Sequence, residues 1–203
     1  TLDIEGDDDV LVDTGVYNLT NTFGVISLLE RGEAGLVVSV IGSPNGTVLN
    51  RLSGPSTVVG FDGPYMVIRD ISINGGQLSL NSDFIDASSV VISNGSIFMS
   101  GDHVTLTNAR LVNASISISS ATTNVVRDVS VRNGSITVTD GRDITLQNLT
   151  VSGSAADGIK VQGNSGYVTV ENCTVAVSGN AYQQGGSASV TLKNSILVAD
   201  GAG

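Results

Sequence analysis

The chain has 203 residues, which is enough for one domain of ordinary size. Only 14% of the residues are charged and 40% are hydrophobic, and 19 acidic residues against 9 basic ones give a net charge of −10. This acidic balance repels nucleic acids and anionic membrane surfaces, and no apolar run is long enough to cross a bilayer. We therefore expect neither nucleic-acid binding nor membrane insertion.

The chain opens with an acidic segment and not with methionine, and we expect a secreted form from which a leader has been removed. Asp7, Asp8 and Asp9 are consecutive, and Asp3 and Glu5 lie just before them. Carboxylate oxygens are the ligands that calcium prefers, so these residues are a candidate calcium site. The alternative is a solvated acidic end, and we expect no other cofactor.

Residues 1–64 are less regular than the rest of the chain. The segment Val10–Tyr17 predicts an opening strand and turn, and Ser27–Gly32 predicts one capped helical turn. We expect a single domain, in which residues 1–64 form N-terminal coils and a cap-like region and residues 65–203 form regular coils.

A repeat of about 20 residues begins near residue 65 and predicts a stacked architecture. It is marked by one polar residue per repeat, and successive markers are 19, 19, 20, 20, 24 and 22 residues apart. The seven markers are Asp70, Ser89, Asn108, Asp128, Asn148, Asn172 and Asn194.

Apolar residues recur two and four positions before the markers and one and three positions after them, and Asn124 is the exception four positions before Asp128. Alternation of period two predicts strands with one buried face, and the change of parity across the marker predicts a bend there. Asn and Asp tolerate the left-handed backbone that a tight bend needs. Stacked at about 4.8 Å, these side chains are also expected to form a structural ladder. Its members are Asp70, Asn108, Asp128, Asn148, Asn172 and Asn194.

A third strand follows eight to ten residues after the marker, after small residues such as Asn94-Gly95-Ser96 that favour a second corner. The sequence therefore predicts an all-β fold, a parallel β-helix (β-solenoid) formed by one chain. Each coil is expected to have three β-strands and 19–24 residues. Right-handed winding is the default for parallel strands joined by crossovers.

Over residues 35–203 these columns resemble the right-handed parallel β-helix superfamily. That superfamily includes pectin and pectate lyases, NosD-like repeat proteins, phage tailspikes and haemagglutinin-type adhesins. The resemblance implies the fold and is uninformative about activity.

Residues for catalysis are sparse in the sequence. Glycoside hydrolysis needs two carboxylates that face one cleft, and no such pair is apparent. The segment Asp157–Lys160 is faintly similar to part of a polygalacturonase, without its paired aspartates. Tyr65, Phe84 and His103 are expected to stack on adjacent coils, and Cys173 occupies an apolar column and is expected to fill the core. We therefore expect no enzymatic activity.

Seven Asn-x-Ser/Thr sequons are candidate glycosylation sites, and glycosylation would place the chain outside the cell. Chance and the repeat itself account for several of them. They are Asn18, Asn45, Asn94, Asn113, Asn133, Asn148 and Asn172.

The last coil ends in an apolar strand close to residue 203, and an uncovered strand edge recruits a partner. We therefore predict an extracellular subunit that assembles with copies of itself into a sheath, filament or surface layer. The expected assembly edge is formed by Val190, Leu192, Ile196 and Val198.

Two alternatives stay open. The long coils predict Gly-, Ser- and Gln-rich loops at Gly153–Gly166 and Ser178–Ala188, and an adhesin-like or tailspike-like module would bind a glycan there through Tyr182, Gln183 and Gln184. A polysaccharide lyase or hydrolase is the other alternative, and acidic residues gathered near Lys160 would favour it.

Overall fold

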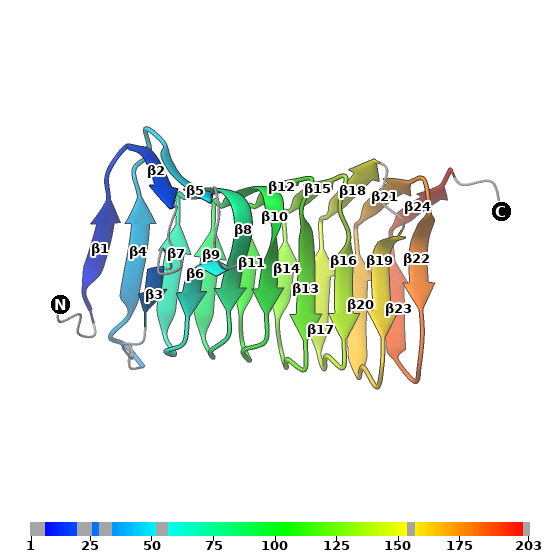
Figure 1. Ribbon diagram of the computed structural model, residues 1–203. Helices are drawn as coiled ribbons and strands as arrows, with labels where there is room; N and C mark the ends of the chain where they lie inside the picture. The colour runs from blue at the N-terminus through cyan, green and yellow to red at the C-terminus, as the bar shows by residue number, and fades with distance from the viewer. Residues whose placement is uncertain (1–6, 20–25, 29–33, 52–56, 154–156, 201–203) are drawn as a thin grey trace.

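The protein is a parallel β-helix, an elongated stack of strands (Figure 1). The computed structural model describes residues 7–19, 26–28, 34–51, 57–153 and 157–200. These residues form 24 strands, and every strand pairing among them is parallel. No helix of the described residues is long and apolar enough to span a membrane.

The strands of successive coils stack into three faces. The first face is a nine-stranded sheet, and a coil is numbered by its position in that sheet. Its strands are β1 (Asp9–Val12), β4 (Val38–Gly42), β7 (Met66–Arg69), β9 (Ile85–Ser88), β11 (Thr105–Thr107), β14 (Val125–Arg127), β17 (Ile144–Gln147), β20 (Tyr167–Glu171) and β23 (Ser189–Lys193). Coils 5, 6 and 7 thus begin at β11, β14 and β17.

The second and third faces belong to one continuous 15-stranded sheet, because β8 (Ser72–Leu80) and β10 (Val91–Met99) each run through both faces. The other strands of the second face are β2 (Gly15–Leu19), β5 (Thr47–Arg51), β12 (Arg110–Val112), β15 (Ser130–Arg132), β18 (Thr150–Gly153), β21 (Thr174–Val177) and β24 (Ile196–Ala199). Those of the third face are β3 (Ile26–Leu28), β6 (Thr57–Phe61), β13 (Ser115–Ser119), β16 (Ile136–Thr139), β19 (Asp157–Gln162) and β22 (Asn180–Gln184).

The core is the stack of inward side chains that the sequence columns predict. Ile68, Leu106 and Leu146, two residues before their markers, are fully buried on the first face. Leu111 and Val151, three residues after their markers, are fully buried on the second face. Strand pairing in register places equivalent residues of successive coils on top of one another, at about 4.8 Å per coil.

A bend occurs at each of the seven markers, where the first face meets the second. This bend is called the first corner. All seven markers have a positive φ between 46° and 60°, in the left-handed region that Asn and Asp tolerate best. The bend is therefore confirmed at every coil from β7 onward.

Four polar residues are buried among the described residues, Thr47, Ser79, Asn124 and Ser165, and Asn124 is the largest of them. Asn124 is fully buried at the start of coil 6, where neighbouring coils have Val104 and Ile144. Its Oδ1 accepts from the Val104 amide at 2.8 Å, and its Nδ2 donates to the Gly101 carbonyl at 3.0 Å. The side chain thus satisfies two backbone groups of the coil below, which explains how an amide is tolerated in the core.

The N-terminal region continues the same stack, because β4 pairs with β7 across the expected boundary at residue 65. Val10–Val12 lies in β1, as the opening strand was expected to. The helical turn expected at Ser27–Gly32 is wrong for its first two residues: Ser27 and Leu28 lie in β3, which pairs with β6. Residues 29–33 lie outside the described residues.

The two longer coils contain strands where loops were expected. Residues 157–162 form β19 within Gly153–Gly166, and residues 180–184 form β22 within Ser178–Ala188. Tyr182, Gln183 and Gln184 therefore lie in a strand that pairs with β19 and not in a loop. The Tyr182 ring packs against the core, so of the three only the two glutamines are exposed.

Candidate functional site

An unbroken asparagine ladder runs along the second corner, where the second face meets the third. Each upper amide donates from Nδ2 to the Oδ1 of the asparagine in the coil below. The five steps are Asn50 to Asn18 (2.9 Å), Asn74 to Asn50 (2.9 Å), Asn94 to Asn74 (3.0 Å), Asn113 to Asn94 (3.2 Å) and Asn133 to Asn113 (3.1 Å). The next coil has Gly153, where an added Cβ would lie 2.1 Å from Asn133 Oδ1. The ladder therefore stops at Asn133.

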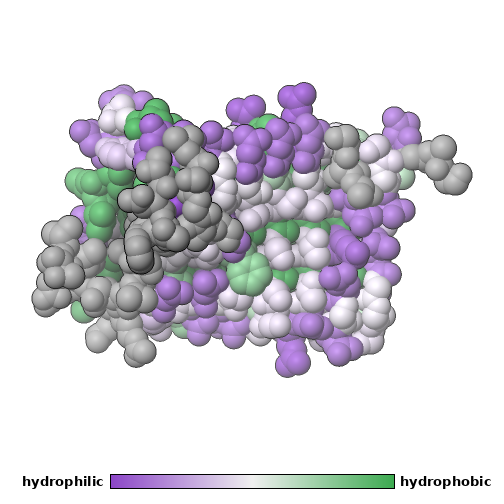
Figure 2. Space-filling view, viewed as in Figure 1, coloured by the Kyte–Doolittle hydropathy of each residue, from purple (hydrophilic) through white to green (hydrophobic). Residues whose placement is uncertain are grey.

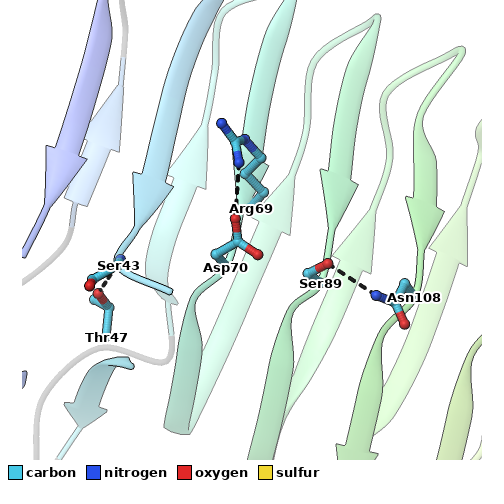
Figure 3. Close-up of polar contacts among 6 residues, drawn as sticks. All are labelled: Ser43, Thr47, Arg69, Asp70, Ser89 and Asn108. Atoms are coloured by element: carbon cyan, nitrogen blue, oxygen red, sulfur yellow. Dashed lines mark hydrogen bonds and ion pairs between the residues drawn. The ribbon is translucent and has the colours of Figure 1, made fainter. Parts of the chain in front are cut away.

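The first corner has a ladder with gaps. Asn148 donates to Asp128 at 2.9 Å and Asn172 donates to Asn148 at 3.4 Å. Asn108 donates to Ser89 Oγ at 3.1 Å, while Asp70 pairs with Arg69 at 3.1 Å (Figure 3). Asn194 also has the left-handed backbone of this corner but is in no side-chain hydrogen bond of the described part.

A polar groove of about 360 Å³ lies beside the second corner in coils 5 to 7 and is called the second-corner groove. Its lining side chains are hydroxyls, one amide, one carboxylate and one amine, with a glycine among them. The lining residues are Ser115, Asn133, Gly134, Ser135, Thr137, Asp157 and Lys160. Its volume is at the lower end of the range of roughly 300–1,000 Å³ that is typical of small-ligand sites.

Strand β19 positions the two charged residues of this groove. Asp157 accepts a hydrogen bond from Asn180 Nδ2 at 2.9 Å, which holds one of its oxygens in a fixed direction. Lys160 is paired in register with Thr137 below and Gln183 above, so its side chain lies on the outer surface. The structure thus brings one acid and one lysine into a shared groove.

A second groove of about 300 Å³ lies at the first corner of the same coils and is called the first-corner groove. Asn108 and Arg110 contribute from coil 5, Asp128 and Ser130 from coil 6, and Asn148 and Thr150 from coil 7, together with Ala109 and Val129. The outer surface of β12 and β15 separates the two grooves. Figure 2 shows hydrophilic residues gathered over these strands, above a paler band over β13 and β16.

Three cations follow this surface, with Arg110 on β12, Arg132 on β15 and Lys160 on β19. None of the three has a carboxylate within 4.0 Å in the described part of the chain. In a protein with a net charge of −10, cations on three adjacent coils that have no acidic partner form a local attraction for anions.

The expected aromatic stack is present at the third corner. The Tyr65 and Phe84 rings are 4.7 Å apart and the Phe84 and His103 rings 4.8 Å apart, all nearly parallel. Because neighbouring rings cover each other's faces, the Phe84 ring, although 43% exposed, presents only an edge to solvent. This arrangement stabilises the coils and offers no open face at Phe84 for a sugar ring.

Within the described ranges, no three acidic, histidine or cysteine residues lie close enough to share an ion, so Asp7, Asp8 and Asp9 are not gathered around one point. A calcium site at this end stays a prediction. Asp3 and Glu5, their expected companions, lie outside those ranges. Cys173 is buried, as its apolar column predicts, and burial raises the pKa of its thiol.

Six of the seven sequons belong to the two ladders. Asn18, Asn94, Asn113 and Asn133 lie in the second-corner ladder, and Asn148 and Asn172 in that of the first corner. Asn45 is exposed in a turn outside both ladders. Glycosylation stays a prediction. At five of these six residues, all but Asn18, the ladder uses the amide nitrogen that would carry the glycan.

The expected assembly edge lies on the last coil. Val190 is partly buried against the core, whereas Leu192, Ile196 and Val198 are 44%, 62% and 49% exposed. Self-assembly into a sheath or filament stays a prediction.

No protein-family model and no curated protein sequence matches the chain. Among solved structures, the chain is similar to a rhamnogalacturonan lyase, with a TM-score of 0.63 and 12% identity, covering 95% of this chain and 60% of that one. It is also similar to an alginate lyase from Paenibacillus sp., with a TM-score of 0.54 and 14% identity, covering 97% of this chain and 91% of that one. At these identities the likeness establishes the fold, a right-handed parallel β-helix.

These similarities correct one expectation. We expected no enzymatic activity, because paired carboxylates are not evident in the sequence. That inference is wrong, since the two similar structures are polysaccharide lyases and the architecture of this chain is one that supports catalysis. The second-corner groove is not evident in the amino-acid sequence, because its residues come from three coils and meet only when the coils stack.

Proposed function

We propose that this protein binds an acidic polysaccharide across the outer surface of coils 5 to 7 and acts on it in the second-corner groove. The observation that carries the proposal is the set of cations Arg110, Arg132 and Lys160, which lack acidic partners although the chain as a whole is strongly acidic. Such cations suit the carboxylates or sulfates of an extended glycan. A protein with this role works outside the cell.

The composition of the second-corner groove favours elimination over hydrolysis. Hydrolysis uses two carboxylates that flank one bond, and Asp157 is the one acid lining this groove. In elimination, Lys160 neutralises the sugar carboxylate, which acidifies the adjacent C–H bond. Asp157 takes that proton, the C–O bond to the leaving sugar breaks, the electron pair forms the new C=C bond, and solvent protonates the leaving oxygen.

Binding is tested by retardation of the protein in native gels that contain polygalacturonate, alginate or neutral dextran. We expect retardation by an acidic polymer and none by dextran. Lys160→Ala should weaken binding about tenfold, which corresponds to about 1.4 kcal/mol. Lys193→Ala removes the same charge from the first face of coil 9 and serves as the matched control. Equal losses in both variants, or equal retardation by dextran, would contradict the proposal.

Cleavage is tested separately, by the ultraviolet absorbance of unsaturated sugar products. Asp157→Asn should abolish product formation and keep most of the binding, because it removes the base and leaves the cations. Product formation that persists in Asp157→Asn would exclude this residue as the base.

Self-assembly is a second candidate function, favoured by the exposed apolar side chains of Ile196 and Val198. A coil from a second copy would cover them, and so would a continuation of the same chain. Electron microscopy of the native protein distinguishes these cases, since regular fibres or sheets support assembly and dispersed particles contradict it.

A further inference from the structure

The ladders follow a simple donor rule. An asparagine has both an N–H donor and a carbonyl acceptor, so in a stack each amide donates downward and accepts from above. Every step of the second-corner ladder has this form, from Asn50 over Asn18 to Asn133 over Asn113. An aspartate carboxylate can accept from above but has nothing to donate to the residue below.

The first corner departs from this rule at three of its six steps, because no side-chain hydrogen bond joins Ser89 to Asp70, Asp128 to Asn108 or Asn194 to Asn172 in the described structure. The step from Asn108 to Asp128 is the one inside the first-corner groove. Asp128 stacks above Asn108, and no hydrogen bond joins the two side chains in the described structure. Asn108 Nδ2 already donates to Ser89, and Asp128 Oδ1 already accepts from Asn148. Asn108 Oδ1 and Asp128 Oδ2 are therefore two neighbouring acceptors with no protein donor, and both residues line the first-corner groove.

We propose that the first-corner groove is a second subsite for the polysaccharide, in which hydroxyl groups of one sugar residue donate to Asn108 Oδ1 and Asp128 Oδ2. The inference rests on the proposed function. Arg110, with no acidic partner, lines the same groove and receives the acidic group of that sugar. The donors that the broken ladder lacks are those that a sugar hydroxyl supplies.

The two grooves lie on opposite sides of the second face. Asp128 and Asn133 are joined by the short strand β15, so at about 3.3 Å per residue the grooves are roughly 15 Å apart. Arg132 is exposed between them. A glycan that fills both grooves therefore crosses the outer surface of the second face and passes over Arg132.

Asp128→Asn gives the decisive test, because the new amide can donate to Asn108 and close the ladder. We expect binding of oligogalacturonate or oligoalginate to weaken about tenfold. Simple electrostatics predicts the opposite sign, since removing an acid should favour a polyanion. Thermal stability should rise by about 2–4 °C, which shows that the variant is folded.

Asp143→Asn is the matched control, because Asp143 is also exposed with a positive φ, at 55°, but lies outside both grooves. Its binding should equal or slightly exceed that of the wild type. Unchanged or tighter binding by Asp128→Asn, with Lys160→Ala still weakened, would overturn the second subsite and keep the proposed function. A wild type that binds no acidic oligosaccharide would overturn both.

Discussion

The first and second corners differ in the side chains that they carry and in how those side chains pair. The second corner carries asparagine at six consecutive coils, and all five steps between them are hydrogen-bonded. The first corner carries Asp, Ser or Asn at seven coils, all with a positive φ, and its ladder is interrupted. Of the six asparagines at the second corner, only Asn94, Asn113 and Asn133 have a positive φ. Several short polar residues thus tolerate a positive φ. A continuous ladder, in contrast, requires a side chain that both donates and accepts a hydrogen bond.

The difference has a functional counterpart. In the unbroken ladder the amide nitrogen and oxygen of each interior asparagine are both hydrogen-bonded, so these residues mainly stabilise the stack. The interrupted ladder leaves acceptors free at the surface. The comparison predicts that ladder substitutions at the second corner act on stability, while those at the step between Asn108 and Asp128 act on binding.

The largest effect is expected at Asn124, which bonds to buried backbone instead of to another asparagine. Asn124→Ala would leave the Val104 N–H and the Gly101 carbonyl without partners in the core, costing about 3–5 kcal/mol. Urea unfolding followed by circular dichroism measures this. If Asn124→Ala lowers the free energy of unfolding by less than a substitution of an exposed ladder asparagine does, water has replaced the amide.

The next effect is expected at the interior of the unbroken ladder. Asn113→Ala removes two side-chain hydrogen bonds and replaces asparagine, which tolerates the left-handed backbone at a φ of 51°, with alanine, which tolerates it less well, for a cost of about 2–3 kcal/mol. Asn113→Gly removes the same bonds without the backbone strain and should cost about 1 kcal/mol less. Equal losses in the two variants would mean that strain at this corner is negligible.

A smaller loss is expected at the first corner. Asn172→Ala removes one long hydrogen bond of 3.4 Å and also replaces asparagine with a residue that tolerates the left-handed backbone less well, at a φ of 54°. We expect a cost of about 1–2 kcal/mol, below that of Asn113→Ala. A larger cost at Asn172 than at Asn113 would reverse the ranking of the two corners.

The smallest effect concerns Cys173, on the inner side of the first corner. Burial raises the pKa of its thiol, so the neutral thiol is the form that the folded state favours. The stability that comes from burying the neutral thiol is fully present below the pKa of the unfolded thiol. It is lost as the pH rises from that value through the higher pKa of the folded state. The free energy of unfolding should therefore fall slightly more between pH 8 and pH 10 in the wild type than in Cys173→Ala, at roughly 1 kcal/mol or less. A parallel decline in both would exclude this linkage.

Much of the fold could be predicted because each coil repeats one local pattern. The markers from Asp70 to Asn194 and their flanking apolar columns fix where the chain bends and which face is buried. The second-corner ladder was only partly accessible, since its lower members Asn18, Asn50 and Asn74 are separated by 32 and 24 residues instead of the regular 19 to 20. Irregular N-terminal coils hide such a column from a search at fixed spacing.

The candidate site was harder to predict, because it depends on which residues of different coils stack together. Asp157 and Lys160 stood out in the sequence, but their groove also needs Ser115, Ser135 and Thr137 from two lower coils. The gap between Asn108 and Asp128 is visible in the sequence only when the direction of donation along the ladder is known.

Gly153 ends the asparagine ladder of the second corner, and this limits where the protein can gain a coil by duplication of a repeat. Coils 4 to 6 present interchangeable asparagines at the second corner, so duplicating the segment 95–113 would insert one more layer and lengthen the molecule by about 4.8 Å with the amide row intact. The same duplication beyond Gly153 would meet a coil with no side chain to receive it. Growth by repeat duplication is therefore favoured in the middle of this protein and disfavoured toward its C-terminal coils.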